Sequence, residues 1–363
     1  MAHRAQTSPT SIDTDWRCRR ERYLRDGFGG VGLEPVTIDE DLEIGKRMHA
    51  GLEAFFGIPA STASPLSIGE GRKDHPTSDR LATALDTIRR EPFTDPWQTW
   101  MEASLMAWAT RVWPELDKQY EIVLVEHMFQ VDIYGVLYKV KPDLILRHRV
   151  DKSYWVYDFK TFRWWDNKRW QRAIQLQLGA WVAELELSKP DHRVEVAGTI
   201  IQGISKGQTR GDKLYHPLVY GYRREADPGI TKAAYAYEYK RGFERFDVNA
   251  YPGGVRAWID CAPADVIGDC FPQTAPIYLD RKMMVEFLGQ RNKREMNIAY
   301  AYEMLEHGTK VPVLDEEFEQ NFSACESDRR RCPMFEACHM ETVRKDPVGS
   351  GLYRLRVREG KYD

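Results

Sequence analysis

The chain has 363 residues, with 52 Lys and Arg residues against 55 Asp and Glu residues and a formal net charge of −3. That balance excludes a uniformly basic nucleic-acid coat protein, although it is compatible with a local basic groove. Hydrophobic residues make up 42% of the chain and charged residues 29%, as in ordinary globular proteins with a core. The sequence contains no apolar run of membrane-spanning length and no apolar signal core after Met1. We therefore expect a soluble protein of the cytoplasm, or of a host cytoplasm if a phage encodes it, with no membrane partner.

The two ends of the chain are predicted to differ from its middle. Residues 1–15 are rich in Ser, Thr and Pro and are expected to be disordered. The segment Trp16–Arg25 is basic and contains Cys18, which on its own would be a buried thiol. We expect one domain over residues 16–340 and a C-terminal tail over residues 341–363.

Three helices are predicted in the first third of the chain, over residues 39–57, 78–91 and 95–113. An aspartate can cap the first helix and Gly57 can end it, whereas Pro114 is expected to end the third. His49 lies in the first helix. Without further context, a single histidine in a helix is more often structural than a metal ligand.

A strand is predicted next, over Tyr120–Ile133, because apolar residues alternate along it. Alternation places Ile122, Leu124 and Glu126 on one face of this strand. A carboxylate in such a position is often simply exposed to solvent, so the strand alone gives Glu126 no role.

The centre of the sequence predicts a β-hairpin. Leu144–Leu146 leads one strand and Tyr154–Tyr157 leads the other, with the polar segment Arg149–Ser153 as the turn. A turn centred in that segment places Asp143 directly opposite Asp158. Directly opposite residues have their side chains on the same face of a strand pair, so the two carboxylates would be neighbours.

Lys160 is predicted to share the face of the two carboxylates, while Tyr157 and Phe159 lie on the other face. Two neighbouring carboxylates repel each other and attract a hard divalent cation. A lysine beside them suits charge stabilisation or proton transfer near a metal-bound water. A surface hairpin with an Asp–Lys ion pair is the alternative, and the spacing alone is equally compatible with it.

Pro142–Asp143, followed by Asp158, Phe159 and Lys160, resembles the PD-(D/E)xK signature of restriction-type nucleases. The second acid is Asp, as in the RecB and AddB branch of that superfamily. The resemblance implies an α/β fold, with a restriction-endonuclease-like central mixed sheet flanked by helices. It also implies that Asp143, Asp158 and the Phe159 carbonyl bind Mg²⁺ or Mn²⁺, and that Asp143, Asp158 and Lys160 are catalytic.

Further residues fit the pattern of this family in the same order along the chain. His49, in a Gly-x-x-x-His segment, resembles the histidine that gives RecB- and AddB-type nucleases a nitrogen ligand favouring manganese. Glu126 matches an acidic strand residue that often accompanies the metal site. Gln175 fits the Gln-Leu-x-Leu run of the family and would be catalytic by binding a phosphate or a metal-bound water. Gln177 is the alternative assignment, because Gly179 stands four residues after Gln175 where the family carries tyrosine.

A basic and aromatic segment follows the hairpin. It suits single-stranded DNA, because bases stack on aromatic rings while cations hold phosphates, but a core-facing aromatic cluster is nearly as compatible. The candidate DNA-binding residues are Arg163, Trp164, Trp165, Lys168 and Arg169. Beyond them we expect helices over residues 172–187, 227–245 and 281–307 and strands over residues 194–205 and 214–222.

Four of the six cysteines form a second family-like pattern. Cys18, Cys325, Cys332 and Cys338 resemble the four-cysteine iron–sulfur staple of AddB-type and CRISPR-associated exonucleases, although the gap from Cys325 to Cys332 is longer than usual. The resemblance implies a 4Fe–4S cluster that joins the chain ends. Four thiolates could bind Zn²⁺ instead, and disulfides are a third alternative that a cytosolic chain disfavours. Cys261 and Cys270 match no ligand pattern.

These features together predict a metal-dependent deoxyribonuclease. The resemblance favours an exonuclease acting on single-stranded DNA or DNA ends in recombination, repair or replication, with a helicase or recombinase as a possible partner. Two alternatives are a non-catalytic DNA-binding accessory protein that keeps the nuclease fold and a zinc-stapled interaction protein. The presence of His49, Asp143, Asp158 and Lys160 favours the enzyme, since a binding-only protein has no need of all four.

Overall fold

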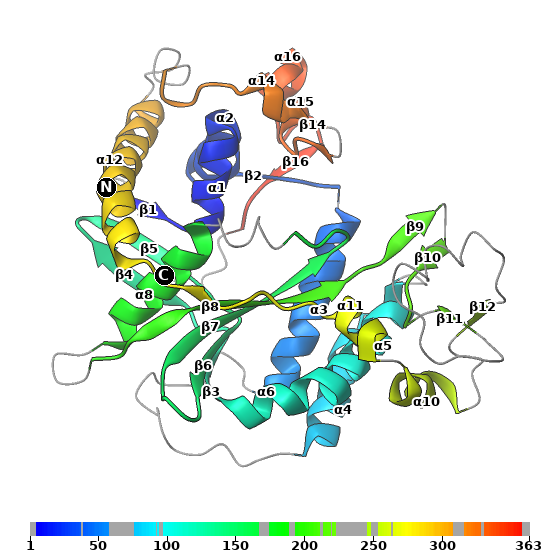
Figure 1. Ribbon diagram of the computed structural model, residues 1–363. Coiled ribbons are helices and arrows are strands. Elements are labelled where there is room, and N and C mark those ends of the chain that lie inside the picture. The colour runs from blue at the N-terminus through cyan, green and yellow to red at the C-terminus, as the bar shows by residue number, and fades with distance from the viewer. Residues whose placement is uncertain are drawn as a thin grey trace.

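The computed structural model describes residues 5–37, 39–57, 76–91, 93, 97–166, 174–188, 193–210, 213–218, 220–222, 245–247, 253–262, 264–307, 316–327 and 330–357. At its centre is a five-stranded sheet with the strand order β13-β8-β7-β6-β3 (Figure 1). Its strands are β3 (Tyr120–Val125), β6 (Leu144–His148), β7 (Tyr154–Phe162), β8 (Val196–Ser205) and β13 (Ile277–Tyr278). β7 and β8 run parallel and the other pairs are antiparallel. The predicted mixed sheet of an α/β fold is therefore confirmed.

The predicted hairpin is formed by β6 and β7. The two strands pair antiparallel, with Leu144 opposite Tyr157. One step further, this register sets Asp143 against Asp158, as the sequence predicted. Tyr157 and Phe159 are buried in the same core cluster on one side of the sheet.

A layer of helices covers the face of the sheet that carries Tyr157 and Phe159 (Figure 1). The layer consists of α3 (Glu40–Phe56), α4 (Thr77–Arg89), α5 (Trp97–Ala107), the π-helical turn η3 (Trp108–Val112) and α6 (Trp113–Gln119). The prediction that Pro114 ends a helix is wrong. Pro114 stands in the first turn of α6, where the missing N–H of a proline costs no hydrogen bond.

The opposite face of the sheet, which carries Ile145 and Val156, packs against two helices and a second sheet. The helices are α8 (Ile174–Leu187) and α12 (Arg281–Glu306), close to their predicted bounds. The second sheet has the order β1-β5-β4, with β1 (Gln6–Thr7), β4 (Phe129–Ile133) and β5 (Val136–Val140). The single strand predicted over residues 120–133 is therefore two strands in different sheets, because β3 ends at Val125 and β4 begins at Phe129.

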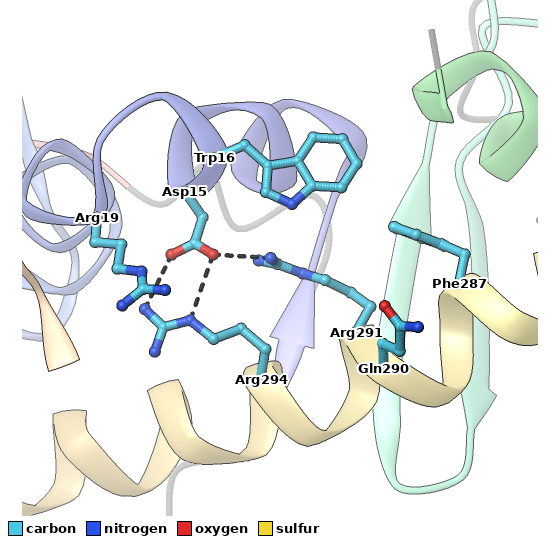
Figure 2. A pocket seen from close by; sticks show the side chains of 7 residues that line it. All are labelled: Asp15, Trp16, Arg19, Phe287, Gln290, Arg291 and Arg294. Carbon is cyan, nitrogen blue, oxygen red and sulfur yellow. Dashed lines mark hydrogen bonds and ion pairs between the residues drawn. The ribbon is translucent and has the colours of Figure 1, made fainter. Parts of the chain in front are cut away.

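The N-terminal segment is ordered, so the prediction of disorder over residues 1–15 is wrong from residue 5 onward. β1 pairs with β5, and α1 (Pro9–Arg17) follows directly. Asp15 of α1 is buried and forms ion pairs with Arg291 and Arg294 of α12 at 2.8 and 3.2 Å (Figure 2). Breaking such buried pairs is costly, which fixes α1 against α12. These partners lie far away in the sequence, so local composition does not reveal them.

The C-terminal segment also packs, so the prediction of a tail over residues 341–363 is wrong up to residue 357. Its elements are α15 (Phe335–His339), α16 (Glu341–Lys345) and β16 (Tyr353–Leu355). β16 pairs antiparallel with β2 (Leu33–Pro35), and the Tyr353 ring is buried in a cluster with Leu24 and Leu33. Strand pairing thus brings the two ends of the chain together.

The remaining described elements are short or connect the layers. They are α2 (Arg19–Arg22), η1 (Tyr23–Gly27), η2 (Phe28–Gly30), β9 (Gln208–Arg210), β10 (Lys213–Tyr215), β11 (Tyr220–Tyr222), β12 (Arg245–Asp247), α10 (Gly254–Cys261), α11 (Ala264–Cys270), α14 (Phe322–Cys325), β14 (Glu326–Ser327) and β15 (Arg330–Arg331). The strand predicted over residues 214–222 is split between β10 and β11. The helix predicted over residues 227–245 lies outside the described residues except for Arg245, which begins β12. Within the described ranges, no helix has the length and apolarity needed to cross a membrane.

Candidate metal centre

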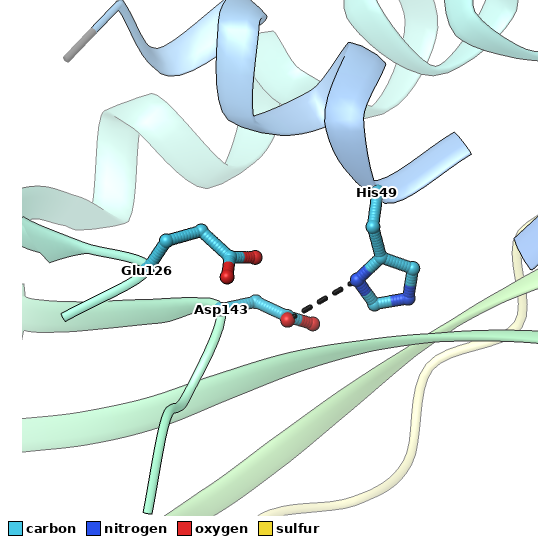
Figure 3. A group of neighbouring side chains, drawn as sticks. All are labelled: His49, Glu126 and Asp143. Carbon is cyan, nitrogen blue, oxygen red and sulfur yellow. Dashed lines mark hydrogen bonds and ion pairs between the residues drawn. The ribbon is translucent and has the colours of Figure 1, made fainter. Parts of the chain in front are cut away.

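Three side chains that can bind a cation meet where β3 ends and β6 begins, next to α3. His49, Glu126 and Asp143 each offer one donor atom, and the three atoms lie within 4.8 Å of one another (Figure 3). In the part of the chain that the structure describes, no other set of three His, Cys, Asp or Glu donors is this close. One imidazole nitrogen and two carboxylate oxygens suit Mg²⁺ or, with the nitrogen, Mn²⁺.

Asp143 is fixed through both of its carboxylate oxygens. Oδ1 lies 3.2 Å from Nδ1 of His49, and Oδ2 accepts a hydrogen bond of 2.5 Å from the backbone N–H of Phe159. Burial disfavours the charged carboxylate, but His49, Lys160 and the Phe159 N–H outweigh it and lower the pKa of Asp143 to about 2. Asp143 is therefore a negatively charged ligand at neutral pH.

Glu126 reaches the centre through an irregularity in β3. The register between β3 and β6 shifts between Ile122 and Leu124, so Ile122 packs in the same core cluster as Val125. The strict alternation predicted for this strand is therefore wrong at Ile122. Glu126 itself has a φ of 48°, and its N–H donates to the Asp143 carbonyl at 2.9 Å. A positive φ is uncommon outside glycine and often marks a functional position.

The carboxyl group of Glu126 titrates near neutral pH. Burial and the charge of Asp143 raise its pKa to about 7, although Lys141 opposes the shift from 2.6 Å away. The pKa of His49 is also raised, because the charge of Asp143 outweighs the effect of burial. A carboxylate or imidazole must lose its proton before it can bind a metal ion.

We therefore expect the affinity for Mn²⁺ to increase as the pH rises through the pKa of Glu126, near 7, and through the raised pKa of His49, and to level off above both. Below the pKa of Glu126 a proton competes with the ion, and each such proton lowers the affinity about tenfold per pH unit. Glu126→Gln should weaken Mn²⁺ binding and make the pH dependence of the affinity shallower, because only the proton on His49 then competes with the ion. Calorimetric titration across this pH range measures both effects. A wild-type affinity that does not change with pH would contradict the assignment.

α3 holds His49 over Asp143 because the helix lies close to β7. Gly45, one turn before His49, leaves little room: a Cβ there would lie 3.3 Å from Oγ1 of Thr161. A side chain at Gly45 would have to displace the Thr161 hydroxyl or the helix by a few tenths of an ångström.

Asp158 and Lys160 lie beside the three donors on β7. Nζ of Lys160 forms an ion pair with Oδ2 of Asp158. Burial and the charge of Asp143 raise the pKa of Asp158, although Lys160 opposes the shift. Burial also disfavours the charged Lys160, but Asp158 and Asp143 outweigh it and raise its pKa. The structure thus groups Asp143 with His49 and Glu126, and pairs Asp158 with Lys160.

The centre opens into a groove of about 530 Å³. His49, Glu126 and Lys160 line one part of it, and Lys46, Lys141 and Lys206 also line it. Asp41 and Glu53 line the groove too, so its lining is mixed, and its four lysines offer ammonium groups to a polyanion.

A model of the PD-(D/E)XK nuclease superfamily matches residues 6–339. The chain belongs to this superfamily. The match covers the hairpin that carries Pro142, Asp143, Asp158 and Lys160. PD-(D/E)XK proteins are typically metal-dependent nucleases. A search of the curated proteins found no relative of the chain.

The candidate DNA-binding residues of this PD-(D/E)XK protein, which follow β7, lie in different environments. Trp164 is 68% exposed. Trp165 instead packs against a buried cluster that includes Leu176, so the alternative of a core-facing aromatic fits this residue. Arg163 forms an ion pair with Asp41 at 3.0 Å. Lys168 and Arg169 lie outside the described residues.

The structure describes the side chain of only one of the two candidate glutamines of α8. Gln175 is in α8, but its side chain lies outside the described residues. Gln177 donates to the Tyr278 carbonyl at 2.8 Å and accepts from the Asp280 N–H at 2.9 Å. These bonds tie α8 to the segment after β13, so the alternative assignment, Gln177, has a structural role away from the metal centre.

The four cysteines predicted to bind a cluster converge from the two ends of the chain. Burial raises the pKa values of Cys332 and Cys338 to about 12 and about 11, and the thiols of Cys18 and Cys325 add to the shift. The N–H of Cys332 donates to the Cys325 carbonyl at 3.0 Å. All six cysteines are in described segments, and none is in a disulfide, whereas Cys261 and Cys270 lie in other helices.

Two polar side chains next to these cysteines were not predicted. His339 Nε2 lies 3.2 Å from the Cys325 sulfur, and Gln320 Nε2 donates to the Cys338 sulfur at 2.8 Å. His339 directly follows Cys338, which is a sequence signal for such a neighbour. The position of Gln320 depends on the fold and has no local signal.

Proposed function

We propose that the chain is a divalent-metal-dependent deoxyribonuclease that hydrolyses phosphodiester bonds. The observation that carries this proposal is the convergence of the His49, Glu126 and Asp143 donors within 4.8 Å, beside the Asp158–Lys160 pair. An accessory protein that only binds DNA has no use for such a donor set. Membership of the PD-(D/E)XK superfamily supports the same reading.

We assign the cation to His49, Glu126 and Asp143, with Asp158 as a further ligand through its carboxylate. The Phe159 carbonyl completes the set. In a strand, the N–H and C=O of one residue lie on the same edge, and the Phe159 N–H points to Asp143. Continued two steps beyond Leu144 and Tyr157, the register sets Phe159 opposite Pro142, which has no N–H to donate. The β-ladder therefore supplies no donor to this carbonyl, which supports its role as a ligand.

A bound divalent ion would make a water a better nucleophile and stabilise the charge on the phosphate and the leaving oxygen. Around it, Lys160 places an ammonium group that can donate to the phosphate oxygens as negative charge develops. Asp158 keeps that ammonium in position. We propose that Gln175 holds a phosphate or a water from α8, and that Trp164 and Arg163, with Lys168 and Arg169, contact the DNA strand.

End-labelled single- and double-stranded DNA, incubated with protein and Mn²⁺, tests the proposed activity. We propose an exonuclease of recombination, repair or replication that acts on single strands or ends and works with a helicase or recombinase. Stepwise loss of the label from linear DNA, with circular DNA left intact, is expected. Nicking of circular DNA would contradict the exonuclease, and no cleavage of any substrate would favour a binding-only protein.

We further propose that Cys18, Cys325, Cys332 and Cys338 hold a 4Fe–4S cluster that joins the chain ends. The thiols of Cys18 and Cys325 both act electrostatically on Cys332 and Cys338, which supports one site shared by the four cysteines. Four thiolates are the ligand set of a 4Fe–4S cluster, and a structural zinc is the chemical alternative.

Cys18→Ser should remove a brown absorbance near ~400 nm and lower the thermal unfolding midpoint. Cys18 and Cys325 come from opposite ends of the sequence, so a shared ligand site restricts nearly the whole unfolded chain. Cys261→Ser, in α10, is the control and should change neither property. Iron analysis of anaerobically purified protein decides between the metals. One zinc without iron would refute the cluster, and no metal with Cys18 open to alkylation would refute the shared site itself.

A further inference from the structure

The groove at the metal centre extends to a second group of charges at the start of α3. Asp41, in the first turn of α3, is bound by two cations: Lys206 Nζ and Arg163 each lie 3.0 Å from its Oδ1. Burial disfavours the charged carboxylate, but these two partners lower the pKa of Asp41 to about 2. The ion pairs of Asp41 with Arg163 and Lys206 therefore tie the start of α3 to the ends of β7 and β8 and hold both cations in place.

Lys206 is unusual for a lysine because it is only 5% exposed while it lines the groove. Its N–H donates to the Phe162 carbonyl at 2.7 Å, which fixes its backbone to the end of β7. Lysines are rarely buried to this extent unless they are paired. The ammonium group has three donor hydrogens, so a bond to Asp41 is compatible with a bond to a second oxygen anion in the groove.

Lys46, five residues after Asp41 on α3, lines the same groove. Its side chain is exposed, and the described residues contain no ion pair to it. Thr161 lines the groove as well and adds a hydroxyl donor. The groove thus presents two lysines and a hydroxyl, the donor types that bind phosphate oxygens.

We propose that Lys46 and Lys206 form a phosphate-binding subsite for the DNA strand whose scissile phosphate lies at the metal centre. This inference rests on the proposed nuclease function and adds the path of the DNA strand along the groove. Strand residues rise about 3.3 Å each, so Phe162, to which Lys206 bonds, is about 13 Å along β7 from Asp158. With one phosphate per about 3.4 Å of helix axis in a strand, this distance is a few nucleotides from the cleaved bond.

Binding of a fluorescein-labelled oligothymidylate, measured by anisotropy at several salt concentrations, tests the subsite. Ca²⁺ replaces Mn²⁺, and a gel confirms that the oligonucleotide stays intact. Each lost phosphate contact should reduce the slope of log affinity against log salt by about 0.7 for a single strand. Lys46→Met and Lys206→Met should each show this reduction, and Lys206→Arg should keep the wild-type slope. Lys118→Met, which removes a lysine paired with Glu115 at 2.7 Å on α6, is the matched control and should not change it.

Unchanged slopes in both Lys46→Met and Lys206→Met, or an equal fall in Lys118→Met, would overturn the subsite. If Lys206→Met fails to fold, Lys46→Met decides alone, because its side chain is exposed. The outcomes separate this inference from the proposed function. Cleavage in Mn²⁺ with unchanged slopes contradicts only the subsite, whereas the expected slopes without any cleavage contradict only the nuclease.

Discussion

Asp143→Asn is expected to lower metal-dependent DNA cleavage about a thousandfold or more, because one bound cation contributes several kcal/mol of transition-state stabilisation. Asp143 is the residue on which the other groups converge: His49 contacts one oxygen and the Phe159 N–H the other. An asparagine keeps an oxygen that can accept from Phe159, so the fold should survive. Cleavage rates in saturating Mn²⁺, together with thermal unfolding, measure the two effects separately.

The matched control for this variant is Asp117→Asn. Asp117 is exposed on α6 and pairs with Arg149 at 3.5 Å, and it belongs neither to the metal donors nor to the groove lining. The Asp117→Asn variant should cleave DNA at the wild-type rate. Full activity of Asp143→Asn in chelator-treated buffer resupplied with Mn²⁺ would refute the assigned centre.

Lys160→Met is expected to reduce turnover by about 10²–10³-fold while the affinity for Mn²⁺ is kept or raised. The lysine donates to developing negative charge, and removal of one such donor costs this much in other enzymes. Its removal also deletes a cation next to Asp143 and Asp158, which lowers the repulsion that an incoming Mn²⁺ meets. Single-turnover rates and calorimetric titration distinguish chemistry from binding.

Lys345→Met provides the comparison for that variant, since it removes a lysine that pairs with Glu341 at 2.7 Å on the surface of α16. It should change neither turnover nor metal binding. A large loss of Mn²⁺ affinity in Lys160→Met, with turnover restored at high Mn²⁺, would show that the lysine acts on the metal and not on the reaction.

The hairpin was predictable from sequence because it depends on local information. Period-two alternation and the polar turn together fix the register that sets Asp143 opposite Asp158, and the structure has that register. The helix α3 was equally visible, since its cap and apolar stripe lie within the segment, and α12 was predicted to within one residue of its observed end.

The ends of the chain were not predictable in the same way. A Ser- and Pro-rich start is typical of a loose terminus, but α1 is held by ion pairs between Asp15 and the arginines of α12. β16 likewise depends on β2, its partner at the opposite end of the sequence. Long-range partners leave no periodic signal in the segments that they order.

The candidate site was predictable as a set of residues but not as a geometry. His49, Asp143, Asp158 and Lys160 followed from their pattern, whereas the place of Glu126 depends on the register shift in β3 and on a positive φ. Neither can be read from alternation. The Asp41–Lys206 pair was also missed, because it joins the first turn of α3 to the end of β8 through the fold alone.

Pulsed electron paramagnetic resonance of bound Mn²⁺ tests the assigned metal centre most directly. The wild-type protein should bind Mn²⁺ with a nitrogen coupling from one imidazole, and His49→Gln should lose that coupling while a weaker oxygen-ligated site remains. Asp143→Asn should lose most of the binding. A wild-type signal without nitrogen coupling, or a coupling that persists in His49→Gln, would contradict the centre formed by His49, Glu126 and Asp143.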